Sequence, residues 1–259
     1  MFREQEVRRW LRHQELTLRI EPSVGSTNTV LKDLAARGAP AGLVLLAEEQ
    51  TAGRGRLGRS FYSPAGTGLY LSLLLRPSYC AEAATMLTPC AAVAVAETIE
   101  ELSGSAAQIK WVNDVFVGGK KVCGILTEAS MDSEGNLLRY VVVGLGVNVR
   151  APEGGFPEDL GGVAGAAFGP GESPELRARL AAGILDRLMD LAQDPADPAV
   201  REAYRNRSMV LGQKIHVLSP GRDPVPAEAV DLGEDYSLLV RLDDGSLTRL
   251  RAGEVSLRP

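Results

Sequence analysis

Three consecutive β-rich runs restrict the fold of this chain more than any other feature of its sequence. The runs 109–117 and 122–129 are separated by Gly118-Gly119, a pair typical of a hairpin turn. The third run, 137–149, follows a polar segment typical of another turn. Because short connections join antiparallel strands and parallel strands need long crossovers, the pattern predicts an antiparallel meander. It therefore favours an α+β fold over alternating βαβ units.

Helical and strand-like patterns surround the meander. Pro89 suits a first helical turn and Gly104 suits a helix end, so this segment gives the clearest helix. Cys90 within it is expected to be a small buried hydrophobic side chain. Further helices are predicted for residues 3–13, 26–38, 174–191 and 199–207, and further strands for residues 16–20, 43–47 and 69–75.

The sequence pattern changes after residue 207. Short β-like runs alternate with Pro-Gly, Gly-Glu-Asp and Asp-Asp-Gly turns up to the end of the sequence. Regularly spaced short strands predict a small β-barrel. We therefore expect two units, residues 1–207 and residues 208–259. Residues 150–172 are rich in glycine and proline and are expected to form a long irregular loop.

Composition excludes several classes of protein. The net charge of −5 over 259 residues argues against a general nucleic-acid binder, which needs a basic surface. Three cysteines without metal-like spacing indicate a reducing compartment and no disulfide framework. The charged N-terminal segment does not resemble a signal peptide, and no apolar run is long enough for a membrane span. We expect a cytoplasmic protein without membrane contact.

A glycine- and arginine-rich segment, residues 53–59, carries the strongest functional signal, and we call it the strap. Three arginines (54, 56 and 59) alternate with three glycines (53, 55 and 58). Glycine lets the backbone approach a ligand closely, and arginine offers planar donors suited to carboxylate and phosphate. A solvated basic loop is the alternative interpretation. Strand-like runs on both sides of the strap favour an anion-binding role.

The same glycines match G-x-G-x-x-G, the fingerprint of dinucleotide binding. That site requires a helix that begins at the third glycine and meets the pyrophosphate. Pro64, Gly66 and Gly68 follow instead, and then a β-like run. A dinucleotide-binding site is therefore disfavoured.

Two further polar clusters interrupt apolar surroundings. Lys110, Asn113 and Asp114 lie in the segment KWVND, where a simple turn is the alternative interpretation. Lys121 leads directly into an apolar run, although paired lysines at this place also suit an exposed hairpin tip. Asn148 interrupts a strand, and a buried Asn must be hydrogen-bonded to backbone or ligand.

The polar triplet at residues 26–28, Ser-Thr-Asn, allows two interpretations. Its hydroxyl groups could cap the helix that follows, or the helix start could bind a polar ligand.

The combined set of cations suits a polyanion that reacts at phosphorus or at a carboxylate. Arg54, Arg56, Arg59, Lys110 and Lys121 supply the positive charge, with the carboxylate of residue 114 among them. The sequence has only two histidines, so a histidine triad or a protein metal motif is disfavoured.

Six segments in order, STN, EEQTAGRGRLGR, KWVND, KKVCGIL, GLGVNV and GEVSLR, resemble biotin protein ligases, which attach biotin to a carrier lysine. The resemblance implies an α+β domain with a mixed, largely antiparallel sheet and flanking helices, followed by an SH3-like barrel. Longer family members add an N-terminal DNA-binding domain. We expect the monofunctional form without DNA contact. Val112 departs from the proline common in the motif, and residues 150–172 match poorly.

The resemblance also implies a role for individual residues. Biotin binding is implied for Ser26, Thr27, Asn28, Gln50, Gly53, Arg54, Gly55, Arg56, Lys121 and Gly124. Nucleotide binding is implied for Arg56, Arg59, Lys110, Asn113, Asp114 and Asn148. Catalysis is implied for Lys110, Asp114, Lys121 and Arg56.

The implied reaction has two steps. The biotin carboxylate attacks the α-phosphorus of ATP, whose Mg²⁺ arrives with the nucleotide, and pyrophosphate leaves. A lysine of a biotin carboxyl carrier protein domain then attacks the adenylate, with Asp114 as the expected proton acceptor. The strap is expected to be a lid that shields the adenylate and is mobile when empty, because its repelling arginines then have little to hold them. A homodimer is compatible with the sequence.

Four alternatives stay open at this point. A lipoate ligase or octanoyl transferase shares the resembling fold, although this chain lacks the RRxxGGG-type block and nearby histidine of those families. Cys123 beside Lys121 keeps an acyl-cysteine transferase in consideration. A biotin-responsive regulator and a bare interaction module fit the acidic charge and the cationic cluster less well.

Overall fold

The computed structural model describes residues 3–132, 138–170, 173, 175–219 and 221–257. Its larger sheet has seven strands in the order β1-β2-β3-β7-β6-β5-β4 within this part of the chain. The strands are β1 (Thr17–Glu21), β2 (Leu43–Ala47), β3 (Gly68–Leu75), β4 (Ala107–Lys110), β5 (Asp114–Val117), β6 (Lys120–Met131) and β7 (Leu138–Asn148). Only β1 and β2 pair in parallel, so the sheet is mixed and largely antiparallel, as predicted.

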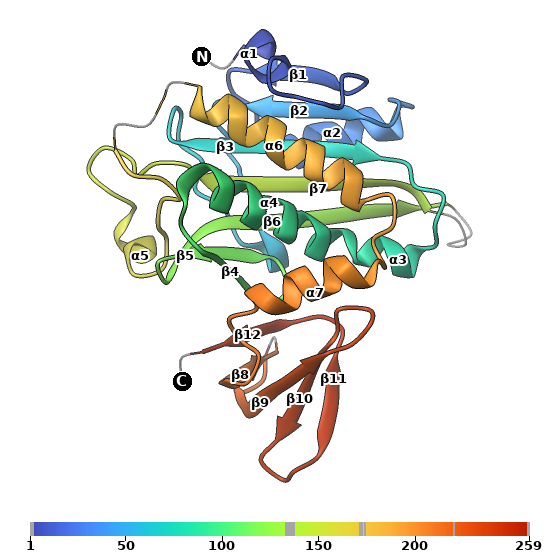
Figure 1. Ribbon diagram of the computed structural model, residues 1–259, viewed down its shortest axis with the longest axis vertical. Helices are drawn as coiled ribbons and strands as arrows, with labels where there is room; N and C mark the ends of the chain where they lie inside the picture. Colours follow the sequence, from blue (N-terminus) through green and yellow to red (C-terminus); the bar gives the residue numbers. More distant parts are fainter. Residues whose placement is uncertain (1–2, 133–137, 171–172, 174, 220, 258–259) are drawn as a thin grey trace.

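Helices cover both faces of this sheet (Figure 1). One face carries α2 (Thr27–Ala36), and the other carries α4 (Leu87–Ser103) and α6 (Leu176–Leu191). The remaining helices are α1 (Glu4–Arg8), α3 (Ala81–Thr85), α5 (Glu158–Gly161) and α7 (Pro198–Arg207). The helix α4 ends at Gly104 in the left-handed conformation, which glycine adopts without a Cβ penalty.

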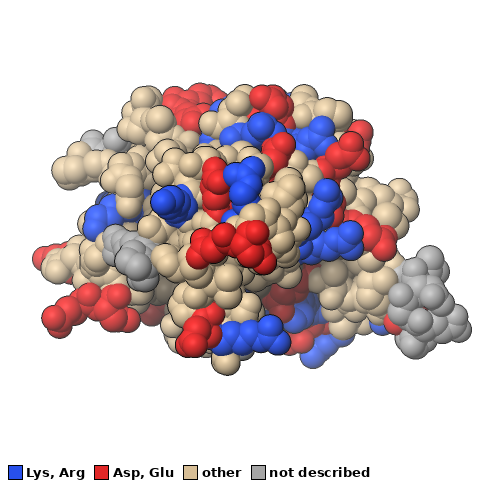
Figure 2. Space-filling view, turned by 90° about the horizontal axis from the view of Figure 1, so that it is seen from below, with Lys and Arg blue, Asp and Glu red and all other residues tan. Residues whose placement is uncertain are grey.

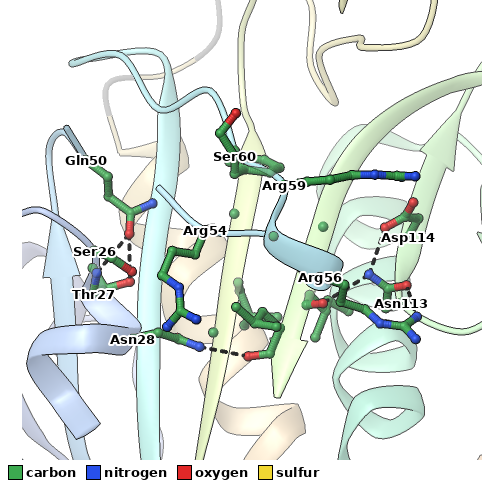
Figure 3. A pocket seen from close by; sticks show the side chains of 18 of the residues that line it. Ser26, Thr27, Asn28, Gln50, Arg54, Arg56, Arg59, Ser60, Asn113 and Asp114 are labelled. Carbon is green, nitrogen blue, oxygen red and sulfur yellow. Dashed lines mark hydrogen bonds between the residues drawn. The ribbon is translucent and has the colours of Figure 1, made fainter. Parts of the chain in front are cut away.

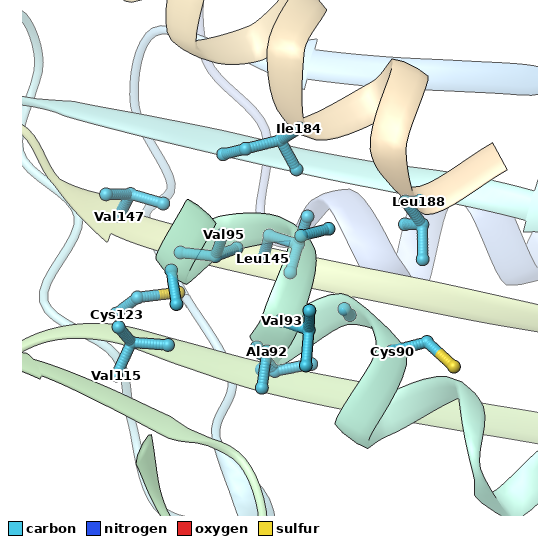
Figure 4. Packing of buried hydrophobic residues seen from close by; sticks show 14 of the residues in the cluster. Cys90, Ala92, Val93, Val95, Val115, Cys123, Leu145, Val147, Ile184 and Leu188 are labelled. Atoms are coloured by element: carbon cyan, nitrogen blue, oxygen red, sulfur yellow. The ribbon is translucent and has the colours of Figure 1, made fainter. Parts of the chain in front are cut away.

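The core follows from the alternation of side chains along each strand. Leu71 and Leu73 of β3 face α4 and α6, whereas Leu74 faces α2. Figure 4 shows the larger cluster, in which α4 and α6 pack on the sheet. Cys90 is fully buried there, as predicted, and burial raises its thiol pKa to about 12.

The sequence prediction of one strand over residues 109–117 was wrong. Two strands, β4 and β5, occupy this region and pair antiparallel, with Lys110 opposite Asp114. The turn between them contains a cis peptide bond at Trp111-Val112. The indole Nε1 of Trp111 donates to the carbonyl of Tyr236 at 2.8 Å, which ties the turn to the C-terminal sheet. The apolar residues of this turn therefore pack against other parts of the protein. In the sequence, the same residues resemble the continuation of a strand, which explains the wrong prediction.

The five C-terminal strands form a second sheet with the order β11-β10-β9-β8-β12. They are β8 (Lys214–Leu218), β9 (Val225–Leu232), β10 (Leu238–Leu242), β11 (Leu247–Leu250) and β12 (Glu254–Ser256). Neighbours pair antiparallel, and no pairing between β11 and β12 closes a barrel in the described residues. Figure 2 views the molecule from this end and shows acidic and basic side chains intermixed on that face.

Two short helices lie outside the sequence predictions. The first, α3, precedes α4, and the second, α5, lies within the segment expected to be an irregular loop. No helix in the described ranges has the length and apolar character needed to cross a membrane.

The N-terminal segment is fastened to α6 through Asp186. This carboxylate is 6% exposed and accepts hydrogen bonds from the backbone N–H groups of Arg12 and His13 at 2.9 to 3.0 Å. Replacing Asp186 with alanine leaves these donors without their acceptor, and we expect a loss of about 1–3 kcal/mol in the free energy of unfolding. Chemical denaturation measures it.

The matched control is Asp190→Ala on the same helix, which removes a half-exposed carboxylate paired with Arg12 and His13. Exposed pairs contribute about 0–1 kcal/mol, so this variant should lose less. Equal losses in the two variants would contradict the assigned role of Asp186.

Candidate functional site

Glycines in the two central strands create a hollow on the α2 face of the sheet. A Cβ atom at Gly144 would lie 1.9 Å from Oδ1 of Asn28, and one at Gly146 would lie 2.5 Å from the ring of Phe61. Gly124 of the neighbouring strand lies under the same ring, with a Cβ distance of 3.2 Å. Side chains at these positions would fill the floor, so the glycines make room for a pocket.

The start of α2 forms the polar end of this pocket (Figure 3). Ser26 occupies the N-cap position but makes no capping hydrogen bond with its side chain. Oε1 of Gln50 instead accepts from the backbone N–H of Thr27 at 2.9 Å and from its hydroxyl at 3.1 Å. Gln50 also donates to Ser63 at 3.1 Å. The triplet is therefore tied into a pocket wall, and simple capping does not account for it.

A buried hydrogen-bond chain continues from the polar end along the same face of the sheet. Asn28 is 3% exposed, and its Nδ2 donates to the carbonyl of Leu126 and to Oε2 of Glu128, both at 3.0 Å. Its Oδ1 accepts from Ser72 at 2.6 Å. The hydroxyl of Ser72 also lies 2.8 Å from that of Thr27. The whole set is hydrogen-bonded within the protein.

The strap crosses above the pocket and contains a short 3₁₀ helix, η1 (Arg56–Gly58). Each of its arginines has a partner on a different part of the protein. Arg54 pairs with Glu128 of β6 at 3.2 Å, and Arg59 pairs with Glu254 of β12 at 2.6 Å.

Arg56 has the most connected position in the strap. Its Nη1 donates to Oδ1 of Asn113 at 2.9 Å, and its Nη2 donates to the carbonyl of Gly253 at 3.1 Å. The expectation that the arginines of an empty strap have little to hold them was therefore wrong. Acceptors distant in the sequence supply the partners that a local sequence pattern cannot show.

An ion pair lies at the opposite end of the pocket from α2. Nζ of Lys121 is 2.8 Å from Oδ2 of Asp114, and both side chains are largely buried. Nδ2 of Asn113 donates to Oδ1 of the same carboxylate at 3.0 Å. Lys121 therefore lies inside the site and is not an exposed hairpin tip, whereas Lys120 donates outward to the carbonyls of Gly161 and Gly162.

Most of the residues predicted for the site line this one pocket, with three exceptions: Gly53, Lys110 and Asn148. Gly53 is packed against the carbonyl of Phe61, where a Cβ would lie at 2.4 Å. Asn148 ends β7 opposite Gly68. The structure thus brings together the strap, the helix start and the KWVND segment, and leaves these three at its margin.

Lys110 lies at the margin of the cationic end. Burial lowers its pKa, the carboxylate of Asp114 acts in the opposite direction, and Lys121 lowers it further. A half-buried ammonium among other cations is poorly solvated, so an anion placed there would gain from its charge.

Cys123 is fully buried beneath the pocket, and burial raises the pKa of its thiol. A buried neutral thiol is a poor nucleophile, so this position does not support an acyl-cysteine transferase. Cys80, in contrast, is exposed.

Sequence reasoning missed several residues of the site. Among them, Phe61, Gly144 and Gly146 line the pocket, and Ser72 and Glu128 hydrogen-bond to Asn28 without lining it. The two glycines share one strand face with a spacing of two, which is a signal for a hollow that could have been recognised. In the described residues, no group of three or more His, Cys, Asp or Glu side chains is arranged to hold a metal ion.

The glycine floor is testable with Gly144→Ala. The added Cβ overlaps Asn28, which is held by several hydrogen bonds and cannot move without breaking some of them. We expect affinity for biotin, the ligand that the resemblance implies, to fall about tenfold or more in isothermal titration. Gly161→Ala is the control, since its Cβ meets open space. Unchanged affinity in Gly144→Ala would refute the role of the floor.

Comparisons with known proteins agree with this geometry. The pattern of the Biotin/lipoate A/B protein ligase family matches residues 21–148. The chain is 43% identical over 141 residues to the bifunctional ligase/repressor BirA of Bacillus subtilis, and the match covers 54% of this chain but only 43% of that protein. It is 33% identical to the biotin–[acetyl-CoA-carboxylase] ligase of Mycobacterium tuberculosis, covering 92% of this chain and 88% of that protein.

Solved structures give the same result. A biotin protein ligase from Aquifex aeolicus, in complex with biotin and ATP, matches with a TM-score of 0.72 and 26% identity over 93% of this chain and 97% of that one. Together with the Mycobacterium relative, this match extends over nearly the whole chain. The chain therefore belongs to the biotin protein ligases of the biotin/lipoate A/B protein ligase family.

Proposed function

We propose that the protein joins biotin to ATP as biotinyl-5′-AMP with release of pyrophosphate, and then transfers biotin to a lysine of a biotin carboxyl carrier protein domain with release of AMP. One observation carries the proposal: a single pocket has an uncharged polar end at the start of α2 and a cationic end at Lys121 and Arg59. Biotin has an uncharged ring system at one end and a carboxylate at the other. One related structure contains biotin and ATP, and another contains biotinyl-5-AMP.

The polar end would hold the ring system of biotin. Thr27, Asn28 and Gln50 supply fixed donors and acceptors in a largely buried wall, with Ser26 beside them. The strap residues Arg54 and Gly55, together with Gly124, line the same space. Such preformed polar groups orient a ligand at small entropic cost.

The cationic end would hold the reacting anions. Arg56, Arg59, Lys110 and Lys121 surround the position where the carboxylate of biotin meets the α-phosphate, and Asn113 and Asn148 complete the nucleotide side. Positive groups fixed before reaction stabilise the charge that develops on the phosphate oxygens. Mg²⁺ would be held mainly by the phosphates of ATP, where it neutralises charge, because the carboxylates of the pocket are engaged with cations.

Asp114 takes a role in each step. In the ligand-free protein it pairs with Lys121, so the carboxylate of biotin must compete for that ammonium. In the second step a protonated carrier lysine approaches, and Asp114 positions the amine and accepts its proton. An attacking amine must be neutral, and lysine has an ordinary pKa of about 10.4, so a nearby carboxylate is needed at neutral pH.

The C-terminal unit would belong to the catalytic machinery. We infer that residues 208–259 fold as an SH3-like barrel distinct from the catalytic unit 1–207, and the five-stranded antiparallel sheet supports this. Gly253 and Glu254 of this unit contact the strap. A cytoplasmic location, the absence of DNA binding and a homodimeric state stay predictions from the sequence.

The main alternative substrate class is lipoate or octanoate, since the family pattern also covers lipoate ligases. The dithiolane ring of lipoate and the alkyl tail of octanoate have no amide groups to offer the polar wall of Thr27 and Gln50. They would gain no hydrogen bonds there, so the wall favours the ring of biotin.

The function is tested by ATP–pyrophosphate exchange with biotin, lipoate and octanoate in parallel. We expect exchange with biotin alone, and loss of exchange in Lys121→Ala because the ammonium facing the carboxylate is removed. Lys120→Ala is the matched control, since its amine points away from the pocket. Exchange with lipoate in place of biotin, or normal exchange in Lys121→Ala, would overturn the assignment.

The alkaline side of the pH–rate profile of ATP–pyrophosphate exchange tests the role of Lys110. Because burial lowers its pKa, Lys110 should lose its proton at a lower pH than an ordinary lysine, and kcat/KM for ATP should fall as pH rises through that value. Lys110→Arg stays charged throughout, so its limb should move to higher pH even if its maximal rate is lower. An identical limb in both proteins would show that another group titrates.

A further inference from the structure

Glu128 lies behind the pocket and is not among the residues that line it. Its side chain is 17% exposed and has three partners, two on α2 and one on the strap. Oε1 lies 2.7 Å from Nζ of Lys32 and 3.2 Å from Nη1 of Arg54, and Oε2 accepts from Asn28 at 3.0 Å. One carboxylate thus joins α2, the strap and β6.

The carboxylate fixes the orientation of the Asn28 amide. An Asn side chain has an oxygen that accepts and a nitrogen that donates, and neighbours decide which way it points. Glu128 and the carbonyl of Leu126 both accept, so they require the nitrogen of Asn28 on their side. Its oxygen must then face Ser72, which becomes a donor. A negative charge behind the wall therefore sets the donor and acceptor pattern of the polar end.

The same carboxylate holds the first arginine of the strap. Figure 3 shows the Arg54 side chain extending from the strap toward Asn28. Glu128 accepts hydrogen bonds from both residues. Burial alone would raise the pKa of Glu128, but hydrogen bonds from Lys32 and Asn28 and the nearby charge of Arg54 lower it overall. The group thus stays ionised at neutral pH.

From these contacts we infer that Glu128 is a positioning residue that couples closure of the strap to the hydrogen-bonding pattern of the ring-binding end of the pocket. The part of the inference that concerns biotin rests on the proposed function. The part that concerns the anchoring of the strap does not. Glu128 contacts no reacting atom and acts through Arg54 and Asn28.

Glu128→Gln tests the inference because it keeps the size of the side chain and removes its charge. Hydrogen–deuterium exchange of peptides covering residues 53–61 in the ligand-free protein should become about fivefold faster or more, as expected for losing a charged hydrogen bond. The Kd for biotin should rise about tenfold, while KM for ATP changes less than twofold. A rise in the Kd for biotin without a matching rise in the KM for ATP separates a positioning role from general destabilisation.

The matched control is Glu100→Gln, which neutralises a similarly buried carboxylate paired with Arg207 away from the pocket. It should change neither strap exchange nor biotin affinity. Arg54→Gln breaks the same anchor from the exposed side and serves if Glu128→Gln fails to fold. It should speed strap exchange equally, and the double variant should add nothing to it.

Strap exchange that stays at the wild-type rate, or effects of the two variants that add, would overturn the coupling. Equal losses for biotin and ATP would also overturn it, since they indicate a structural role only. If the wild-type protein itself bound no biotin, the proposed function would fail, whereas the exchange measurements would still decide whether Glu128 anchors the strap.

Discussion

The strap depends on one electrostatic constraint: each of its three guanidinium groups needs an acceptor, and none of these acceptors lies in the strap itself. Glu128, Asn113 and Glu254 meet this requirement from β6, from the turn before β5 and from the C-terminal sheet. The closed arrangement is therefore defined by residues that belong to the rest of the protein. Anionic ligands would offer stronger partners to the same cations, and binding can then be an exchange of acceptors.

The pocket beneath the strap depends on small residues in the most central strands of the sheet. Gly144 and Gly146 of β7 leave space for Asn28 and Phe61, which a side chain on either glycine would displace. The rigid sheet thus places polar groups from α2 and a ring from the segment after the strap over one floor. A site supported by strands keeps its geometry while the loop above it moves.

Sequence patterns predicted the parts of the structure that local chemistry decides. The hairpin at Gly118-Gly119 and the end of α4 at Gly104 follow from residues that adopt left-handed backbone conformations. The sheet was correctly expected to be mixed. The break between β4 and β5 was not predicted, because Trp111 fits a strand pattern locally while its indole N–H donates to the carbonyl of Tyr236, 125 positions away.

The partners of the site cations could not be predicted either, because they are distant in the sequence. Arg59 meets Glu254 at a separation of 195 residues, and Glu128 meets Asn28 at 100. Only the folded chain brings these groups together, so the resemblance identified most pocket-lining residues but not what holds them. The closure of the C-terminal sheet likewise depends on contacts that strand spacing does not encode.

We expect ligand anions to replace the protein's own acceptors on the strap. A crystal structure with a non-hydrolysable biotinyl-adenylate analogue tests this exchange most directly. Residues 53–59 should be folded over the analogue, with Arg56 or Arg59 within hydrogen-bonding distance of its phosphate in place of Asn113 or Glu254. A strap that lies away from the analogue, or that keeps all of its present partners, would rule out this exchange of acceptors.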